Sequence, residues 1–235
     1  MRVALFGYGA MGQLIETQAQ AAGDEIGAKL TSQQSSDKID DLSSALAGHD
    51  VAIDFSVGAA VAKHVEACMR AGVPIVQGTT GWKQHEDEVN RLVVEHAGAM
   101  VFGANFSIGV NVFYRIVERA AALFSSLDQY QPFIEEQHHA RKKDAPSGTA
   151  LKLESVLSEH WKRPISMAST RAGFIPGTHR VGFDSAADQI TLTHTARSRE
   201  GFAAGALLAA HWIVGRQGVY EFSDVIDELM KKGDG

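Results

Sequence analysis

The chain begins MRVALFGYGAMG (residues 1–12), and this stretch sets the architecture of its first half. The apolar run at residues 2–6 predicts a β-strand, which Gly7, Gly9 and Gly12 follow in the pattern G-x-G-x-x-G. Glycines at this spacing permit a tight turn and let the backbone approach a pyrophosphate at the positive end of the next helix. The stretch predicts a dinucleotide-binding βαβ unit; the alternative is a glycine-rich turn that binds nothing.

Further strand-like runs follow the first one, and helical patterns separate them. The runs lie at residues 25–30, 51–55, 73–77 and 100–102. Strands that alternate with helices predict an α/β fold with a parallel, doubly wound, Rossmann-like sheet.

The pattern changes after residue 107. A long apolar helical pattern at 108–127 is followed by several strand-like runs. These lie at residues 130–136, 165–171, 180–183 and 189–195. Grouped strands predict a smaller α+β domain with a mainly antiparallel sheet. We expect residues 1–107, completed by C-terminal helices within 202–235, to form the dinucleotide-binding domain, and residues 108–201 to form the second domain.

The composition is typical of a soluble globular protein. The 235 residues are 45% hydrophobic and 21% charged, with a net charge of −6. No apolar run approaches the roughly 18 residues of a membrane span, the first residues lack a signal-peptide cleavage site, and the basic residues form no long stripe. The single cysteine, Cys68, fits a reducing compartment. We therefore expect a cytoplasmic protein that binds neither nucleic acid nor a membrane.

The end of the second predicted strand bears on the cofactor. It reads Leu30-Thr31-Ser32, without the acidic residue that grips the ribose hydroxyls of NAD about 20 residues beyond the glycines. Nothing there repels a 2′-phosphate, but no arginine is present to bind one, so both NADPH and NADH remain open. We interpret Lys29 as a solvated side chain.

Small and hydroxyl-bearing residues follow three other predicted strands. The loops are Asp54-Phe55-Ser56, Gly78-Thr79-Thr80-Gly81 and Ala104-Asn105-Phe106-Ser107. Ligands of open α/β sheets bind beyond the carboxyl ends of the strands, so these loops are candidates for nicotinamide and ribose contacts. Each loop alone is equally compatible with ordinary turn chemistry, but three together favour binding.

The segment EEQHHARKKDAPSGTA, residues 135–150, gathers proton-transfer and anion-binding groups in an acidic protein. The neighbours His138 and His139 diverge in a strand or a helix, and no second pair of metal ligands has the usual spacing, so we predict no metal site. One imidazole can act as acid or base while the other binds substrate. Lys142 adds a mobile cation and proton donor.

The sequence PSGTA at residues 146–150 predicts the start of a helix. The N–H groups of Gly148 and Thr149, with neighbouring hydroxyls such as that of Ser147, suit a carboxylate or phosphate. The alternative is a basic surface loop with an ordinary helix cap. Arg171 and Arg199 are candidates to clamp a second carboxylate, or else surface ion-pair partners.

These residues resemble the dihydrodipicolinate reductase family, also called 4-hydroxy-tetrahydrodipicolinate reductases, of bacterial lysine and diaminopimelate synthesis. The most specific match is HHARKKDAPSGTA, from His138 to Ala150. Support comes from residues 54–56, 78–81, 104–111 and 171–179, and from His194, Ala196 and Arg199. The resemblance runs from Arg2 to about Trp212.

The resemblance implies roles for individual residues. His138 matches the proton donor or acceptor and Lys142 a second proton donor. Together with the predicted helix start and the candidate arginines, the resemblance implies substrate contacts at His139, Ser147, Gly148, Thr149 and Arg199. The expected cofactor contacts are Gly7, Tyr8, Gly9, Ala10, Met11, Gly12, Thr31, Phe55, Gly78, Thr79, Thr80, Ala104, Asn105, Phe106 and Ser107.

The implied function is hydride transfer from NADPH or NADH to a cyclic imine that bears two carboxylates. A small dicarboxylate is then the partner, and residues 108–201 form the substrate-binding and oligomerisation domain of a homotetramer. Two departures leave the cofactor preference open: the glycine loop is a residue shorter than in many relatives, and Thr31 and Ser32 replace a frequent acidic-basic pair.

Two alternatives come from other classes. A non-catalytic dinucleotide-binding redox regulator would need neither His138 nor Lys142. A different Rossmann oxidoreductase would act on another carboxylated imine or carbonyl. A semialdehyde dehydrogenase would require a nucleophilic cysteine, but Cys68 lies on the apolar face of a predicted helix.

Overall fold

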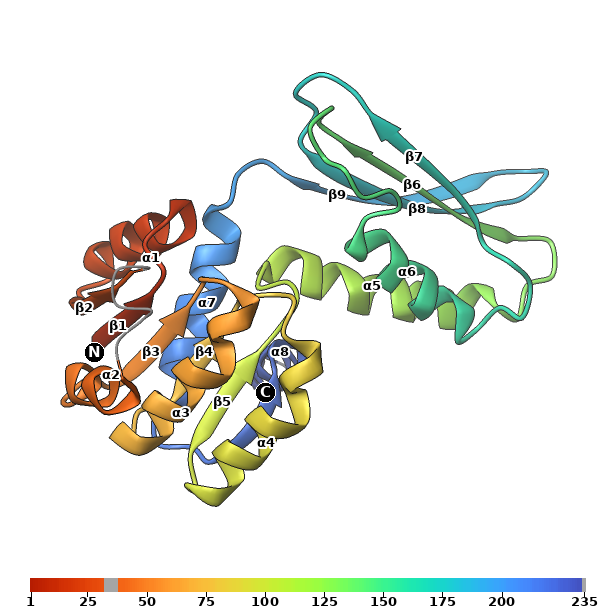
Figure 1. Ribbon diagram of the computed structural model, residues 1–235. Coiled ribbons are helices and arrows are strands. Elements are labelled where there is room, and N and C mark those ends of the chain that lie inside the picture. Colours follow the sequence, from red (N-terminus) through yellow and green to blue (C-terminus); the bar gives the residue numbers. More distant parts are fainter. Residues whose placement is uncertain (32–37, 234–235) are drawn as a thin grey trace. The chain divides into compact units, whose positions relative to one another are not determined.

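The structure is a computed structural model that describes residues 1–31 and 38–233. The chain forms two compact units (Figure 1). The first contains Met1–Ile108 and Arg199–Gly235, and the second contains Gly109–Ser198.

The first unit is built on a parallel six-stranded sheet in the order β10-β5-β4-β3-β1-β2. The strands are β1 (Arg2–Phe6), β2 (Glu25–Leu30), β3 (Val51–Asp54), β4 (Ile75–Gln77), β5 (Ala99–Phe102) and β10 (Gly218–Glu221). The predicted parallel, Rossmann-like sheet is confirmed. Only β10 was not predicted, because its four residues form neither an apolar run nor a regular alternation.

Helices cover both faces of this sheet (Figure 1). They are α1 (Ala10–Ala21), α2 (Ile39–Leu46), α3 (Val61–Ala71), α4 (Glu86–Glu95), α7 (Glu200–Ile213) and α8 (Phe222–Gly233), with short 3-10 turns at η1 (Gly58–Ala60) and η2 (Lys83–His85). α1 packs beside α7, while α2, α3 and α4 pack side by side. Apolar side chains of α2, α3 and α4 share a core with those of the sheet, so burial on both faces explains why these strands are apolar throughout.

The second unit has a four-stranded sheet in the order β7-β6-β8-β9. The strands are β6 (Gln131–His138), β7 (Ser166–Arg171), β8 (Gly177–Asp184) and β9 (Gln189–Ala196). β6 and β7 are parallel because α6 (Gly148–Ser158) crosses between them, and the other two pairings are antiparallel. The sheet is therefore mixed, with the predicted antiparallel majority.

α6 and the long helix α5 (Ile108–Phe124) supply the core of the second unit. Phe113 and Val117 of α5 and Leu153 of α6 pack with Val181 and Phe183 of β8. α5 ends three residues before the predicted position. β6 continues two residues beyond it, so His138 is the last residue of a strand. Among the residues that the structure describes, no helix has the length and apolarity needed to cross a membrane.

Candidate active site

The glycine loop after β1 has the geometry of a pyrophosphate site. Gly7 has a φ of 86°, and a Cβ on it would lie 2.4 Å from the carbonyl oxygen of Phe55. A Cβ on Gly12 would lie 2.4 Å from the Gly7 oxygen, so only glycine permits this close packing. A Cβ on Gly9 would meet no atom within 4 Å, and Gly9 is the N-cap of α1. The loop thus leaves open space beside a helix N-terminus, which fits the diphosphate of a dinucleotide.

The loops after β3 and β4 are joined by one buried carboxylate. Asp54 accepts hydrogen bonds from the Ser56 N–H at 2.9 Å and the Thr79 hydroxyl at 2.9 Å. His64 Nδ1 of α3 lies 2.8 Å from the same carboxylate, and its ring stacks on Phe6. The Thr79 side chain is thus bonded within the unit, whereas Thr80 beside it is exposed. Asp54 and His64 were not predicted as a pair, because one lies in a strand and the other in a helix.

The third predicted cofactor loop is only partly exposed. Ala104 is exposed and Asn105 half-buried, and the Asn105 side chain accepts a hydrogen bond from the Ser107 N–H. Ser107 is buried, and Phe106 packs among Phe55 and Phe222. The structure therefore places Phe106 in the core of the first unit.

Lys29 is exposed, in line with the interpretation of a solvated side chain, but it is also paired. Its Nζ lies 2.6 Å from the Glu16 carboxylate and 4.4 Å from the centroid of the Tyr8 ring, in the glycine loop. The Tyr8 hydroxyl also donates to Glu16, and the hydrogen bond to Glu16 is the main cause of a raised Lys29 pKa. Thr31, at the end of β2, is half-buried, and Ser32 lies outside the described residues.

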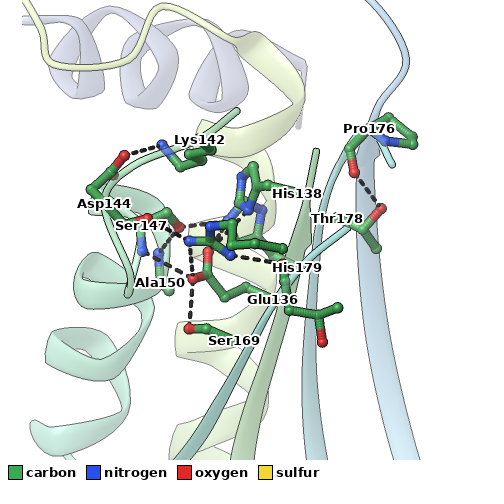
Figure 2. Close-up of polar contacts among 12 residues, drawn as sticks. Glu136, His138, Lys142, Asp144, Ser147, Ala150, Ser169, Pro176, Thr178 and His179 are labelled. Atoms are coloured by element: carbon green, nitrogen blue, oxygen red, sulfur yellow. Dashed lines mark hydrogen bonds and ion pairs between the residues drawn. The ribbon is translucent and has the colours of Figure 1, made fainter. Parts of the chain in front are cut away.

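A row of polar residues crosses the sheet of the second unit. Ser169, Glu136, His179 and His194 stand directly opposite one another on β7, β6, β8 and β9. Glu136 and His138 lie two residues apart in β6 and therefore share a face. Figure 2 shows Glu136, His138, Ser147 and His179 gathered at the start of α6.

The Glu136 carboxylate lies at the centre of this group, with a fully buried side chain. Its Oε1 accepts from the Ser147 N–H at 3.1 Å, the Ser169 hydroxyl at 2.7 Å and Arg171 Nη2 at 2.7 Å. Burial alone would raise the pKa of Glu136, but the hydrogen bonds from Ser147, Ser169 and Arg171 outweigh burial and lower that pKa to about 2. The carboxylate is therefore ionised at neutral pH.

Two imidazoles flank the other oxygen of Glu136. Oε2 lies 3.2 Å from His138 Nδ1 and 3.7 Å from His179 Nε2, which also lies 3.0 Å from the Ser147 hydroxyl. Burial is the largest cause that lowers the pKa of His138, opposed by the Glu136 charge. Burial, with the neighbouring His138, lowers the pKa of His179 to about 4. Both imidazoles are therefore uncharged at neutral pH.

Glu136, His138 and His179 also place three possible metal ligands within 4.8 Å of one another. Sequence spacing did not reveal this group, because His179 comes from another strand. A metal ion would share the carboxylate with Arg171, which already brings a positive charge to it. The carboxylate and imidazoles can satisfy one another without a metal, and the absence of a metal site stays a prediction.

The loop between β6 and α6 carries Lys142. Its Nζ lies 2.9 Å from the Asp144 carboxylate, and its side chain is 25% exposed. Figure 2 shows this ion pair as a dashed line. Arg171 Nη2 donates to the Asp144 carbonyl oxygen at 2.6 Å as well as to Glu136. Arg171 is thus an ion-pair partner, which disfavours a carboxylate clamp, but the pair is largely buried and not on the surface as the alternative had it.

The start of α6 is an ordinary helix cap that also leaves room for an anion. Ser147 is the N-cap, and its hydroxyl accepts from the Ala150 N–H at 3.2 Å. A Cβ on Gly148 would meet no atom within 4 Å. The Thr149 hydroxyl bonds to Tyr114, whose pKa is raised by burial despite that hydrogen bond. The first amides of a helix have no intrahelical acceptor, so this open N-terminus suits a carboxylate.

Two further predicted substrate residues, His139 and Arg199, belong to different units. His139 follows β6 and is half-buried. Arg199 is exposed and belongs to the first unit, whereas the other predicted substrate residues belong to the second. Cys68 is fully buried in α3, and its burial raises the pKa of the thiol well above the ordinary value, so it is not available as a nucleophile.

Comparison with known proteins identifies relatives over nearly the whole chain. Residues 1–106 match the family model "Dihydrodipicolinate reductase, N-terminus", and residues 109–226 match "Dihydrodipicolinate reductase, C-terminus". A 4-hydroxy-tetrahydrodipicolinate reductase of Christiangramia forsetii is 36% identical over 98% of this chain and 100% of the relative. One of Anaeromyxobacter dehalogenans is 38% identical over 80% of this chain and 76% of the relative.

Solved structures share the fold. The dipicolinate-bound dihydrodipicolinate reductase of Paenisporosarcina sp. TG-14 matches with a TM-score of 0.78 and 21% identity, over 94% of this chain and 97% of that one. A probable dehydrogenase of Thermotoga maritima matches with a TM-score of 0.60 and 9% identity, over 98% and 94% of the two chains.

Proposed function

The chain belongs to the dihydrodipicolinate reductase family, and we propose that it reduces 4-hydroxy-tetrahydrodipicolinate to tetrahydrodipicolinate in lysine and diaminopimelate biosynthesis. The observation that carries this proposal is the segment from His138 to Gly148. It combines a buried imidazole, the cation of Lys142 and an open helix N-terminus in a protein of net charge −6. A small dianionic substrate accounts for all three features.

The first unit would hold the cofactor. A bound NADH or NADPH supplies the hydride. Gly7, Gly9 and Gly12 would hold its pyrophosphate at the N-terminus of α1, and the loops after β3 and β4 would orient the ribose and nicotinamide. The network around Asp54 keeps those two loops in place before the cofactor binds.

The second unit would hold the substrate. One carboxylate would lie at the start of α6, where Gly148 leaves space for it and the amides of Gly148 and Thr149 can donate to it. Lys142 lies on the loop directly before this helix and offers a charge for the same dianion. We expect His139 and Arg199 to add substrate contacts.

The reaction requires one proton in addition to the hydride. The substrate loses its 4-hydroxyl as water, hydride adds to ring C4, and the electron pair pushed to the enamine carbon takes up a proton. His138 or Lys142 would deliver that proton, a step worth about 10²–10⁴-fold in rate. Burial keeps His138 uncharged in the free protein, and a dianion beside it would favour the charged form that can donate.

The test is an assay of the full chain with NADPH and with NADH, in the presence of a chelator. The substrate is made in situ from pyruvate and aspartate semialdehyde by the preceding enzyme of the pathway. Substrate-dependent loss of reduced nicotinamide supports the function, and the ratio of kcat/KM values gives the cofactor preference. No turnover by a folded chain that still binds the dinucleotide would instead favour a redox regulator or another imine or carbonyl substrate.

We also propose that the chain forms a homotetramer through the sheet of the second unit. Within residues 109–198, α5 and α6 lie against one face of this sheet only (Figure 1). The opposite face carries the cross-strand pair Thr178 and Thr195 and their neighbours Thr191 and Thr193. Light scattering after size exclusion measures the mass, and a monomer at assay concentrations would contradict the proposal.

A further inference from the structure

We infer that Glu136 is a positioning residue for proton transfer, an inference that rests on the role proposed for His138. The Glu136 carboxylate accepts the Nδ1–H of His138 through Oε2. This fixes the tautomer of the imidazole and leaves Nε2 as the nitrogen that exchanges a proton with the substrate. The same carboxylate holds the start of α6 through Oε1, so one buried group would align both the proton carrier and the anion site.

Glu136 Oε2 lies next to Nδ1 of His138. The two atoms lie 3.2 Å apart, and each is buried without an aligned hydrogen bond to any described residue. A carboxylate oxygen can only accept, and an imidazole nitrogen can donate, so the two atoms are complementary. Catalytic hydrogen bonds are often poorly aligned before substrate binds, and a small ring rotation would align this one.

The opposite nitrogen of His138 lies on the side of the ring that packs against Gly177 of β8. A Cβ placed on Gly177 of β8 would lie 3.2 Å from Nε2 and 3.3 Å from Cδ2 of His138. The ring therefore has Glu136 on its Nδ1 side and a position without a side chain on its Nε2 side. This asymmetry favours Nδ1 as the anchored nitrogen and Nε2 as the working one.

The charges around His138 show why an anionic partner matters. Arg171 of β7 and Lys142 of the loop lower the pKa of His138, while Glu136 and Asp144 oppose them. His179 of β8 lies ring-to-edge with His138, 5.1 Å between centroids, and is uncharged at neutral pH. Glu136 is the negative charge closest to the ring, so it supports the imidazolium that donates the proton.

The other oxygen of Glu136, Oε1, contacts the start of α6 and Arg171. This oxygen accepts from the Ser147 N–H at 3.1 Å, and Ser147 is the N-cap of α6. Arg171 reaches the same oxygen and the Asp144 carbonyl oxygen, in the loop that carries Lys142. A shift of the Glu136 carboxylate would therefore move the proposed acid and the proposed carboxylate site together.

The substitution Glu136→Gln tests this role, with Glu135→Gln as the matched control. Gln keeps the size of Glu136 but removes its charge and can present an N–H to His138. Glu135 is the preceding residue, points to the opposite face of β6 and makes a half-exposed ion pair with Arg180. The control thus makes the same chemical change on the other side of the same strand.

The first readout is the tautomer of His138, measured by ¹H–¹⁵N NMR on the full chain without substrate. The signal is assigned by its loss in His138→Gln. We expect wild type and Glu135→Gln to carry the proton on Nδ1, and Glu136→Gln to shift it toward Nε2. A wild-type His138 that carries its proton on Nε2 would overturn the inference, and this result does not depend on the folding of Glu136→Gln.

The second readout is kinetic. We expect Glu136→Gln to lower kcat by about 10²-fold or more with a smaller change in KM. It should also move the alkaline limb of the pH–rate profile to lower pH, because the imidazolium that donates the proton loses its anion. A kcat within a few-fold of wild type would overturn the inference. So would a change in KM as large as the change in kcat, together with a pH–rate profile that is the same as that of wild type. Failure of wild type to turn over substrate would instead overturn the proposed function, while the tautomer still tests the hydrogen bond.

Discussion

The Arg171 guanidinium lies 2.7 Å from the Glu136 carboxylate, across the parallel pairing of β7 and β6. Their side chains are 15% and 0% exposed, so the ion pair is largely shielded from water. Arg171 also donates to the Asp144 carbonyl oxygen at 2.6 Å, which ties the loop that carries Lys142 to the sheet. The pair therefore links the stability of the second unit to the arrangement of its candidate site.

Replacement of Arg171 by Met should destabilise the protein strongly. Met keeps much of the side-chain volume but leaves the Glu136 charge buried without its partner, which costs about 3–5 kcal/mol in comparable pairs. Urea unfolding measures the loss. The control is Arg70→Met, because Arg70 and its partner Asp40 are 43% and 82% exposed, and its effect should stay below about 1 kcal/mol. If the two substitutions lowered the free energy of unfolding equally, the buried ion pair of Arg171 and Glu136 would contribute no more to stability than an exposed pair.

Acid should destabilise the fold in two steps. His179 has a pKa of about 4 in the folded state, below its ordinary 6.5, so the unfolded chain binds its proton first and stability falls as pH drops from 6.5 to 4. Glu136 has a pKa of about 2, below its ordinary 4.5, so its contribution is lost as pH drops from 4.5 to 2. Each step is on the order of 3 kcal/mol at most.

Urea unfolding at a series of pH values measures both steps. His179→Gln should flatten the upper step relative to wild type while the lower one remains. Stability of wild type that stays constant between neutral pH and pH 4 would contradict the assignment of a buried, uncharged His179.

The sequence predicted those parts of the fold that depend on a motif or a periodic pattern within one short segment. The glycine motif and the alternation of strands and helices indicated the parallel sheet, and grouped strands indicated the second one. β10 escaped prediction because four residues, GVYE, carry no period. The parallel pairing of β6 and β7 follows from the crossover through α6, which depends on three-dimensional packing rather than on any one segment.

The same distinction applies to the candidate site. His138, Lys142, Ser147 and Gly148 are close in sequence and could be proposed together. Glu136 meets His179 and Ser169 only through the register of three strands, and a single sequence does not specify register. An acidic residue two positions before a candidate histidine, on the same face of a strand, was the one local signal that could have identified Glu136.

Two glycines of the first loop should respond differently to alanine. Gly7→Ala combines a φ of 86° with a Cβ 2.4 Å from a backbone oxygen, so the variant should fold poorly. Gly9→Ala meets no atom within 4 Å, so it should melt like wild type but bind NADPH and NADH more weakly, because its methyl group occupies the proposed pyrophosphate space. Calorimetric titration measures binding. Unchanged dinucleotide affinity in a folded Gly9→Ala variant would move the pyrophosphate away from this loop.

Lys142→Ala should lower kcat far more than it weakens cofactor binding. The side chain is held by Asp144 in the loop before α6, and its proposed work is charge and proton donation rather than packing. A decrease of about 10²-fold in kcat is expected from the loss of a general acid. Lys143→Ala changes the neighbouring, exposed lysine and should have little effect. Unchanged turnover in Lys142→Ala would leave His138 as the proton donor.

Gly148→Ala separates the anion site from the stability of the helix that forms it. The added methyl group meets no atom within 4 Å in the free protein, and alanine favours a helix over glycine by roughly 0.5–1 kcal/mol, so stability should be equal or higher. If a substrate carboxylate lies against Gly148, the methyl group takes its place and KM should rise by about tenfold, the equivalent of one weakened charge-assisted hydrogen bond. Steady-state kinetics and thermal unfolding on one preparation measure KM and stability.

Thr149→Ala is the companion variant, since it removes the hydroxyl bonded to Tyr114 but leaves the backbone amide in place. A KM that rises in Thr149→Ala and not in Gly148→Ala would place the carboxylate on the hydroxyl side of the turn instead of over the amides.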